Sequence, residues 1–201
     1  MLRSTFRLFG LAALAVAFAL PVLTPTALAQ DAATIKQMLQ DRDTEIKAIL
    51  GTGTSYTDAQ RERLRTVVND VIDFRAMGAY ALGDTWDTLT EEQRSRFVDA
   101  FSGTVRRQSL ARLDIYQATV SYGEVAVDGT TATATTTTTY RDTRAEVVYD
   151  LAKSNGEWLV TDITIDGVGT AGPYRRSFQR MIARRGYDAL VSSLERTLAR
   201  E

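Results

Sequence analysis

The spacing of apolar residues changes from a helical period to a period of two near residue 117, and it changes back after Pro173. Before the first change, apolar residues recur at intervals of three and four, which is typical of helices with one buried face. Between the changes they alternate with polar residues, and Asp128-Gly129 and Asn155-Gly156 are strong hairpin signals. Helices, then strands, then helices predict one α+β domain built on a four-stranded antiparallel meander.

Two of the expected helices have clear starts. Thr57 with Gln60, and Thr90 with Gln93, have the spacing of a capping box, in which both side chains satisfy free backbone N–H groups. Residues 78–87 separate the helices that these boxes begin. The predicted helices span residues 31–50, 57–75, 90–113 and two segments after residue 173, and the predicted strands span residues 120–127, 131–140, 145–151 and 158–165.

The predicted strand contains only threonine and alanine at residues 131–139. One interpretation is an exposed or edge strand, because threonine is favoured on pleated surfaces. The other interpretation is a buried strand that presents only small side chains to the core, like a floor beneath it. If Ala132 and Ala134 face inward, the core beside them is hard to fill, and unfilled apolar volume is what a ligand can occupy. The sequence leaves both interpretations open.

The first 29 residues have the pattern of a secretory signal peptide. Arg3 and Arg7 precede a run of 13 uncharged, mostly apolar residues, and Ala27-Leu28-Ala29 supplies a cleavage site. A run of this length spans only about 20 Å as a helix, less than the roughly 30 Å of a bilayer core. We therefore expect residues 1–29 to be removed and residues 30–201 to form one exported domain. Without cysteine, that domain cannot be lipidated through a thiol.

The chain has neither cysteine nor histidine, which excludes thiol nucleophiles, Ser-His-Asp triads and zinc sites with thiolate or imidazole ligands. Pairs of carboxylates do not supply an alternative catalytic site. Asp162 and Asp166 share a strand face but lie about 13 Å apart, too far for glycoside hydrolysis. A net charge of -1 gives no basic footprint for nucleic acid. We therefore expect no catalytic residue, no metal site, no cofactor and no nucleic-acid partner.

Several short motifs follow one another along the chain. They are residues 73–77 (Asp-Phe-Arg-Ala-Met), 82–86 (Leu-Gly-Asp-Thr-Trp), 92–94 (Glu-Gln-Arg), 148–151 (Val-Tyr-Asp-Leu), 156–163 (Gly-Glu-Trp-Leu-Val-Thr-Asp-Ile), 166–168 (Asp-Gly-Val) and 174–175 (Tyr-Arg). Their order and approximate spacing resemble the MlaC family of periplasmic phospholipid-binding proteins, and the resemblance covers nearly all of residues 30–201. One departure is the segment 169–173, Gly-Thr-Ala-Gly-Pro, which replaces a serine and two aliphatic residues beside the cavity mouth of relatives.

The resemblance implies an apolar cavity between sheet and helices that holds phospholipid as cargo. It also implies two membrane partners, an inner-membrane ABC transporter complex with a substrate-binding ring and an outer-membrane lipoprotein–porin complex. Between them the carrier would shuttle lipid and maintain outer-membrane asymmetry. Two alternatives remain: an exported interaction module with a hydrophobic partner-binding face and no lipid cavity, and a hydrolase that needs one indispensable acid.

Large apolar side chains in these segments are the candidates for lipid contact, although ordinary core residues have the same character. Tyr174 and Arg175 are expected nearer to the opening of the cavity. The residues expected to contact acyl chains are Phe74, Met77, Phe97, Phe101, Val147, Tyr149, Trp158, Val168 and Phe178.

Overall fold

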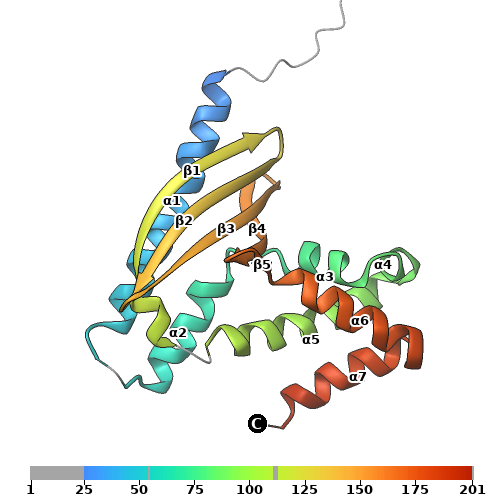
Figure 1. Ribbon diagram of the computed structural model, residues 1–201. Helices are drawn as coiled ribbons and strands as arrows, with labels where there is room; N and C mark the ends of the chain where they lie inside the picture. The colour runs from blue at the N-terminus through green and yellow to red at the C-terminus, as the bar shows by residue number, and fades with distance from the viewer. Residues whose placement is uncertain (1–24, 54, 111–112, 201) are drawn as a thin grey trace, which may run out of the picture.

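The computed structural model describes residues 25–53, 55–110 and 113–200. Figure 1 shows a curved sheet with a long helix across one face and a lobe of helices at one end. This arrangement confirms the predicted α+β class. The helices are α1 (Pro25–Leu50), α2 (Asp58–Asn69), α3 (Phe74–Leu82), α4 (Thr85–Thr88), α5 (Glu91–Ser109), the 3-10 helix η1 (Leu113–Gln117), α6 (Ala171–Arg185) and α7 (Tyr187–Leu198).

The sheet is the predicted meander with one short addition. The order is β1-β2-β3-β4-β5, and all neighbours are antiparallel. Asn155 and Gly156 both have positive φ, as a tight hairpin turn requires. Because β2 lies between two strands, the edge-strand interpretation of residues 131–139 is wrong. The strands are β1 (Thr119–Asp128), β2 (Thr131–Tyr140), β3 (Thr143–Ser154), β4 (Glu157–Ile165) and β5 (Val168–Gly169).

The predicted helix at residues 57–75 is wrong, because α2 ends at Asn69 and α3 begins at Phe74. The linking residues 70–73 form a strap along β4: Val160 N donates to Val71 O at 2.8 Å, and Asp73 N donates to Val160 O at 2.9 Å. The Asp73 side chain then caps α3. These backbone hydrogen bonds pair N–H and C=O groups at the edge of β4. Pairing these groups outweighs the tendency of residues 70–73 to continue the helix, which the spacing of the apolar residues had indicated.

Other helix boundaries also differ from the predictions. Residues 78–87 contain the end of α3 and the short α4, and the helix predicted at 90–113 ends at Ser109. Both capping boxes are confirmed. The first helix starts at Pro25, so the predicted cleavage site at Ala27–Ala29 lies within α1. Residues 1–24 lie outside the described residues, and cleavage after Ala29 stays a prediction.

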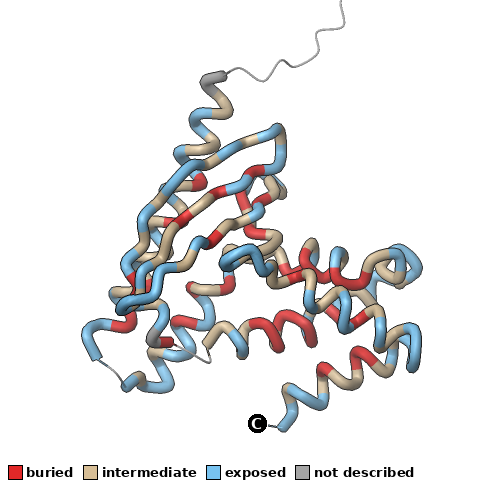
Figure 2. The backbone as a smooth tube through the Cα atoms, in the orientation of Figure 1, coloured by how far each residue is buried: buried red, intermediate tan, exposed pale blue. Residues whose placement is uncertain are grey.

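The buried apolar residues, red in Figure 2, form three clusters, the third of which joins the end of α1 to α2 and η1. The first is the centre of the helical lobe, where α3, α5, α6 and α7 meet. At Gly78 in α3, an added Cβ would lie 2.9 Å from the Phe97 ring, so these two helices approach closely. The second cluster lies between α1 and the sheet. The inner face of the sheet is therefore covered by α1 and by the strap at residues 70–73.

Candidate functional site

The inner face of the sheet is the candidate functional site. Three rows of side chains cross it from β1 to β4, and the β2 residue is small in every row. The rows are Val127–Ala132–Leu151–Val160, Val125–Ala134–Tyr149–Ile163 and Tyr122–Thr136–Val147–Ile165. The small β2 side chain in each row stands lower than its neighbours on β1 and β3, and we call this strip of small residues, Ala132, Ala134 and Thr136, the channel.

The three channel residues are buried, with exposed fractions of 6% for Ala132, 1% for Ala134 and 2% for Thr136. Ala132 and Ala134 therefore face inward, as the second interpretation of this strand predicts. Ile35 and Leu39 of α1 belong to the same buried cluster. In this structure α1 supplies the apolar contact that the short side chains of β2 do not.

Tyr122 and Tyr149 of the channel rows, and Tyr116 in the neighbouring cluster of α1, α2 and η1, keep uncharged hydroxyl groups. Burial raises the pKa of Tyr116 to about 12 and also raises the pKa of Tyr122 and Tyr149. Tyr116 Oη donates to Ser109 O at 2.9 Å, and Tyr122 Oη lies 3.4 Å from Leu39 O. A surface of aliphatic side chains and neutral phenols suits hydrocarbon and is unfavourable for a charged group.

Asp31 fastens α1 to the sheet beside the channel. Its Oδ1 accepts hydrogen bonds from Lys153 Nζ at 2.7 Å and from Trp158 Nε1 at 3.1 Å. Lys153 and Trp158 lie on the two strands of the β3–β4 hairpin. The bonds from Lys153 and Trp158 lower the pKa of the Asp31 carboxyl below its usual value. The contact therefore favours the charged carboxylate.

We expect Asp31→Asn to lower the melting temperature by roughly 1–3 °C at pH 7, because it removes a partly exposed ion pair. A carboxyl whose pKa is lowered by folding contributes stability above its unfolded-state pKa and loses it as pH falls through the folded-state value. The difference between the two proteins should therefore shrink below about pH 4. Thermal unfolding from pH 3 to pH 7 measures it, and a difference independent of pH would contradict this role of Asp31.

Five of the predicted lipid contacts meet in the helical lobe. Phe97 and Phe101 stack with ring centroids 5.5 Å apart, and the Phe178 ring stands edge-on to both. Phe74 and Met77 complete this cluster, and none of the five is more than 6% exposed. These side chains already satisfy one another, so contact with an acyl chain requires the lobe to loosen.

The other predicted residues occupy four different environments. Val147, Tyr149 and Trp158 lie on the inner face of the sheet, with Trp158 beside Asp31. Tyr174 packs against the aromatic cluster of the lobe. Arg175 lies over the Tyr80 ring and donates to Tyr80 O at the end of α3. Val168, on β5, is 66% exposed.

Some residues of the inner face are absent from the predicted set. The helical spacing of Ile35 and Leu39 and the alternation of Val125 and Val127 were visible in the sequence. Those patterns indicate that each residue is buried but not what it is buried against. The missing information is the position of α1 across the sheet.

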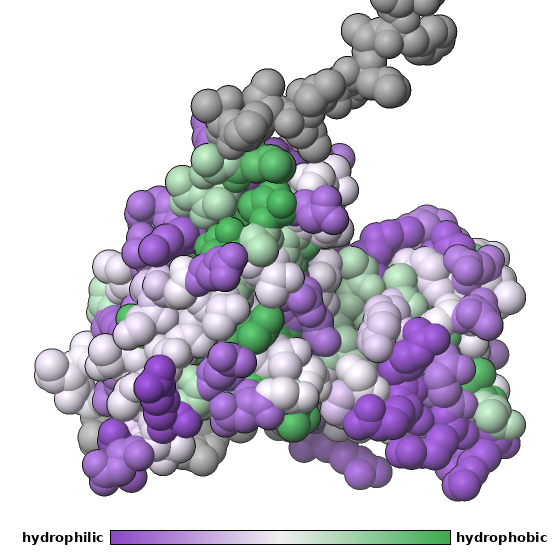
Figure 3. Space-filling model, turned by 45° about the horizontal axis from the view of Figure 1, so that its top comes forward, coloured by the Kyte–Doolittle hydropathy of each residue, from purple (hydrophilic) through white to green (hydrophobic). Residues whose placement is uncertain are grey.

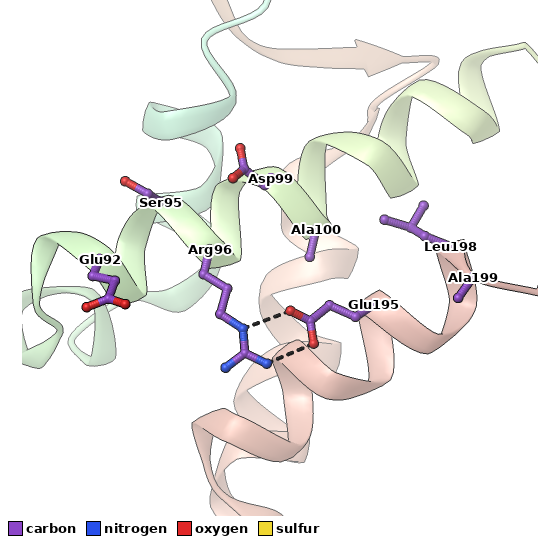
Figure 4. A pocket seen from close by; sticks show the side chains of 8 residues that line it. All are labelled: Glu92, Ser95, Arg96, Asp99, Ala100, Glu195, Leu198 and Ala199. Carbon is purple, nitrogen blue, oxygen red and sulfur yellow. Dashed lines mark hydrogen bonds and ion pairs between the residues drawn. The ribbon is translucent and has the colours of Figure 1, made fainter.

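Two hollows on the molecular surface lie away from this channel. One, of about 740 Å³, is a groove between α5 and α7 (Figure 4). Its two sides are joined by a bidentate ion pair in which Arg96 Nε lies 2.8 Å from Glu195 Oε1. The other follows the outer face of α1 between Gln30 and Glu45. Charged residues line both, so neither suits an acyl chain.

The part of the chain that the structure describes contains no helix long and apolar enough to cross a bilayer. Within the same residues, no group of acidic side chains is arranged to hold a metal ion.

Comparison with solved structures identifies the fold. The phospholipid-binding protein from Ralstonia solanacearum, solved in complex with a phospholipid, matches with a TM-score of 0.69 and 25% sequence identity. The alignment covers 83% of this chain and 96% of that one. None of the curated proteins matches the sequence. The family model described as MlaC protein matches residues 28–196, and this chain therefore belongs to the MlaC family.

Proposed function

We propose that this chain carries phospholipid through the periplasm and that the channel along β2 receives the acyl chains. The observation that supports this most strongly is the bound phospholipid in the Ralstonia solanacearum relative, which shares this fold over nearly its whole length. Proteins of the MlaC family are periplasmic and non-enzymatic. The neutral, apolar inner face of the sheet agrees with hydrocarbon cargo.

The cargo sets an energetic requirement. Exposing two acyl chains of roughly 15 methylenes each costs on the order of 24 kcal/mol, at about 0.8 kcal/mol per methylene. An open groove cannot offset that cost, so the lipid must be enclosed. In this structure, Ile35 and Leu39 occupy the space over the channel. Binding therefore requires the helices to move away from the sheet.

The strap at residues 70–73 is where we place this movement. It joins α2 to α3 and is held to β4 by the two backbone bonds at Val160. Because the predicted continuous helix is in fact two helices, α2, together with α1 that packs against it, can rotate about the strap separately from the helical lobe. Breaking two hydrogen bonds costs far less than unfolding either helix.

The direction of transport must be set by the protein partners. The described chain has no nucleotide-binding motif, so a ligand-driven change requires a partner that binds the loaded and empty states differently. We assign these roles to an inner-membrane ABC transporter complex and an outer-membrane lipoprotein–porin complex. Lipid removed from the outer membrane would then be returned inward, which maintains asymmetry.

Organic extraction of the purified mature protein tests the proposal directly. Mass spectrometry is expected to recover one or two diacyl phospholipids per chain. The same protein, stripped of lipid and mixed with vesicles, should take lipid up again. A chain that is purified without lipid and acquires none from vesicles would instead be an interaction module with a hydrophobic face.

A further inference from the structure

The helix α6 is strongly basic on a chain that is otherwise acidic. It contains five arginines and no acidic residue in its 15 residues. Outside α6, residues 30–201 contain 17 lysines and arginines against 25 aspartates and glutamates, a net charge of -8. The positive charge of the domain is therefore concentrated on one element.

Three of these arginines form a stripe on the outer side of α6. Arg176, Arg180 and Arg184 are four residues apart, so they lie about 6 Å from one another along one side of the helix. All three are exposed, whereas Phe178 on the opposite side is buried. Figure 3 shows strongly hydrophilic residues over the helical lobe, where α6 lies. We call this stripe the basic face.

Among the described residues, no acidic side chain pairs with the basic face. Elsewhere in the lobe, arginines have carboxylate partners: Arg75 with Glu91, and Arg96 with Glu195. Asp188, at the start of α7, is the acidic residue nearest to the stripe in sequence, and no ion pair of the described chain joins it to Arg176, Arg180 or Arg184. Free guanidinium groups bind phosphate oxygens in a bidentate manner.

We propose that the basic face docks on the anionic headgroups of a phospholipid bilayer. The stripe is straight, and the exposed residues among the arginines are small or polar, as Ser177 and Ala183 are. A protein partner would be expected to need an apolar anchor there, since binding energy concentrates in buried aromatic and apolar contacts. A plane of phosphates needs none.

The proposal goes beyond cargo binding, because it concerns the outside of the molecule. Each basic residue held near an anionic membrane raises partitioning by about fivefold, so three contribute on the order of 100-fold at low salt. The attraction should fall steeply as the Debye length shortens from about 10 Å at 0.1 M salt to about 3 Å at 1 M. Docking of this kind is weak and reversible, which suits a protein that must leave again.

Flotation with vesicles tests the proposal on the full mature chain. The protein is mixed with phosphatidylcholine vesicles that contain or lack 30% phosphatidylglycerol, at roughly 50 mM and 500 mM salt. We expect binding only to the anionic vesicles at low salt. The triple variant Arg176→Gln, Arg180→Gln, Arg184→Gln should lose that binding by on the order of 100-fold.

A matched variant separates the basic face from overall charge. Arg61 on α2, Arg144 on β3 and Arg200 just beyond α7 are exposed, and changing all three to glutamine alters the net charge equally. This control should lose no more than about threefold in binding. Equal losses in the two variants, or full retention in the first, would overturn the proposal. Lipid recovered by extraction should stay the same in both, which separates failure of docking from failure of cargo binding.

Discussion

Replacing Ala134 with tryptophan should lower the phospholipid recovered per chain at least tenfold. Ala134 is 1% exposed at the centre of the middle row, between Val125 and Tyr149. An indole there would fill the channel that we assign to acyl chains. Overpacking a core typically costs about 1–3 kcal/mol and more for a large insertion, so circular dichroism must show that the variant is folded. Extraction followed by mass spectrometry, referred to the amount of folded protein, gives the measurement.

The neighbouring residue provides the control. Thr133 precedes Ala134 on β2, but its exposed side chain lies on the opposite face of the sheet. Thr133→Trp adds the same bulk outside the channel and should leave bound lipid unchanged. If Ala134→Trp stays folded by circular dichroism and still carries a full complement of lipid, then the acyl chains do not lie along β2.

A disulfide between the strap and β4 should slow lipid uptake at least tenfold. Ile72 and Val160 form a parallel bridge, and paired strands lie about 4.8 Å apart, within the 4.4–6.8 Å that separates the Cα atoms of a disulfide. Since the chain has no cysteine, Ile72→Cys with Val160→Cys forms one defined cross-link. The oxidised protein cannot lift the strap from the sheet, and reduction should restore uptake. Transfer of fluorescent phospholipid from vesicles provides the rate.

A second cross-link controls for the effect of introducing two cysteines and a disulfide. Thr133 and Asp150 face each other on β2 and β3, outside the channel. Cysteines at these two positions join strands that we do not expect to separate, so uptake should proceed at the normal rate in either redox state. Undiminished uptake by the oxidised Ile72–Val160 protein would show that the strap does not need to move.

Local chemistry allowed much of the fold to be predicted from the sequence. Asn155-Gly156 defines a hairpin by its backbone conformations, and Thr57 and Thr90 begin helices by capping them. The break after Asn69 was not predictable in this way. Val71 and Ile72 continue the helical spacing of apolar residues, and only the free edge of β4, far away in sequence, favours an extended strap there.

The candidate site could be predicted only in part. The run of alanine and threonine was compatible both with an exposed or edge strand and with a floor of small residues. The burial of Ala132 and Ala134 depends on α1, which lies about 90 residues earlier in the chain. Conversely, Phe97, Phe101 and Phe178 have the size expected of lipid contacts, yet here their rings contact one another. The type of a residue indicates that its side chain is hydrophobic, but the tertiary arrangement decides which groups that side chain contacts.

The strand order of the sheet affects the order in which the protein folds. Every strand of the sheet pairs with the strand next to it in sequence, so each pairing closes only a short loop. Low contact order favours rapid folding, because little chain entropy is lost before contacts form. We expect the meander to assemble early and α1 to dock afterwards, since its contacts with the sheet span much longer separations. A transient species with a formed sheet would then present its uncovered apolar face, and a chaperone would bind that species.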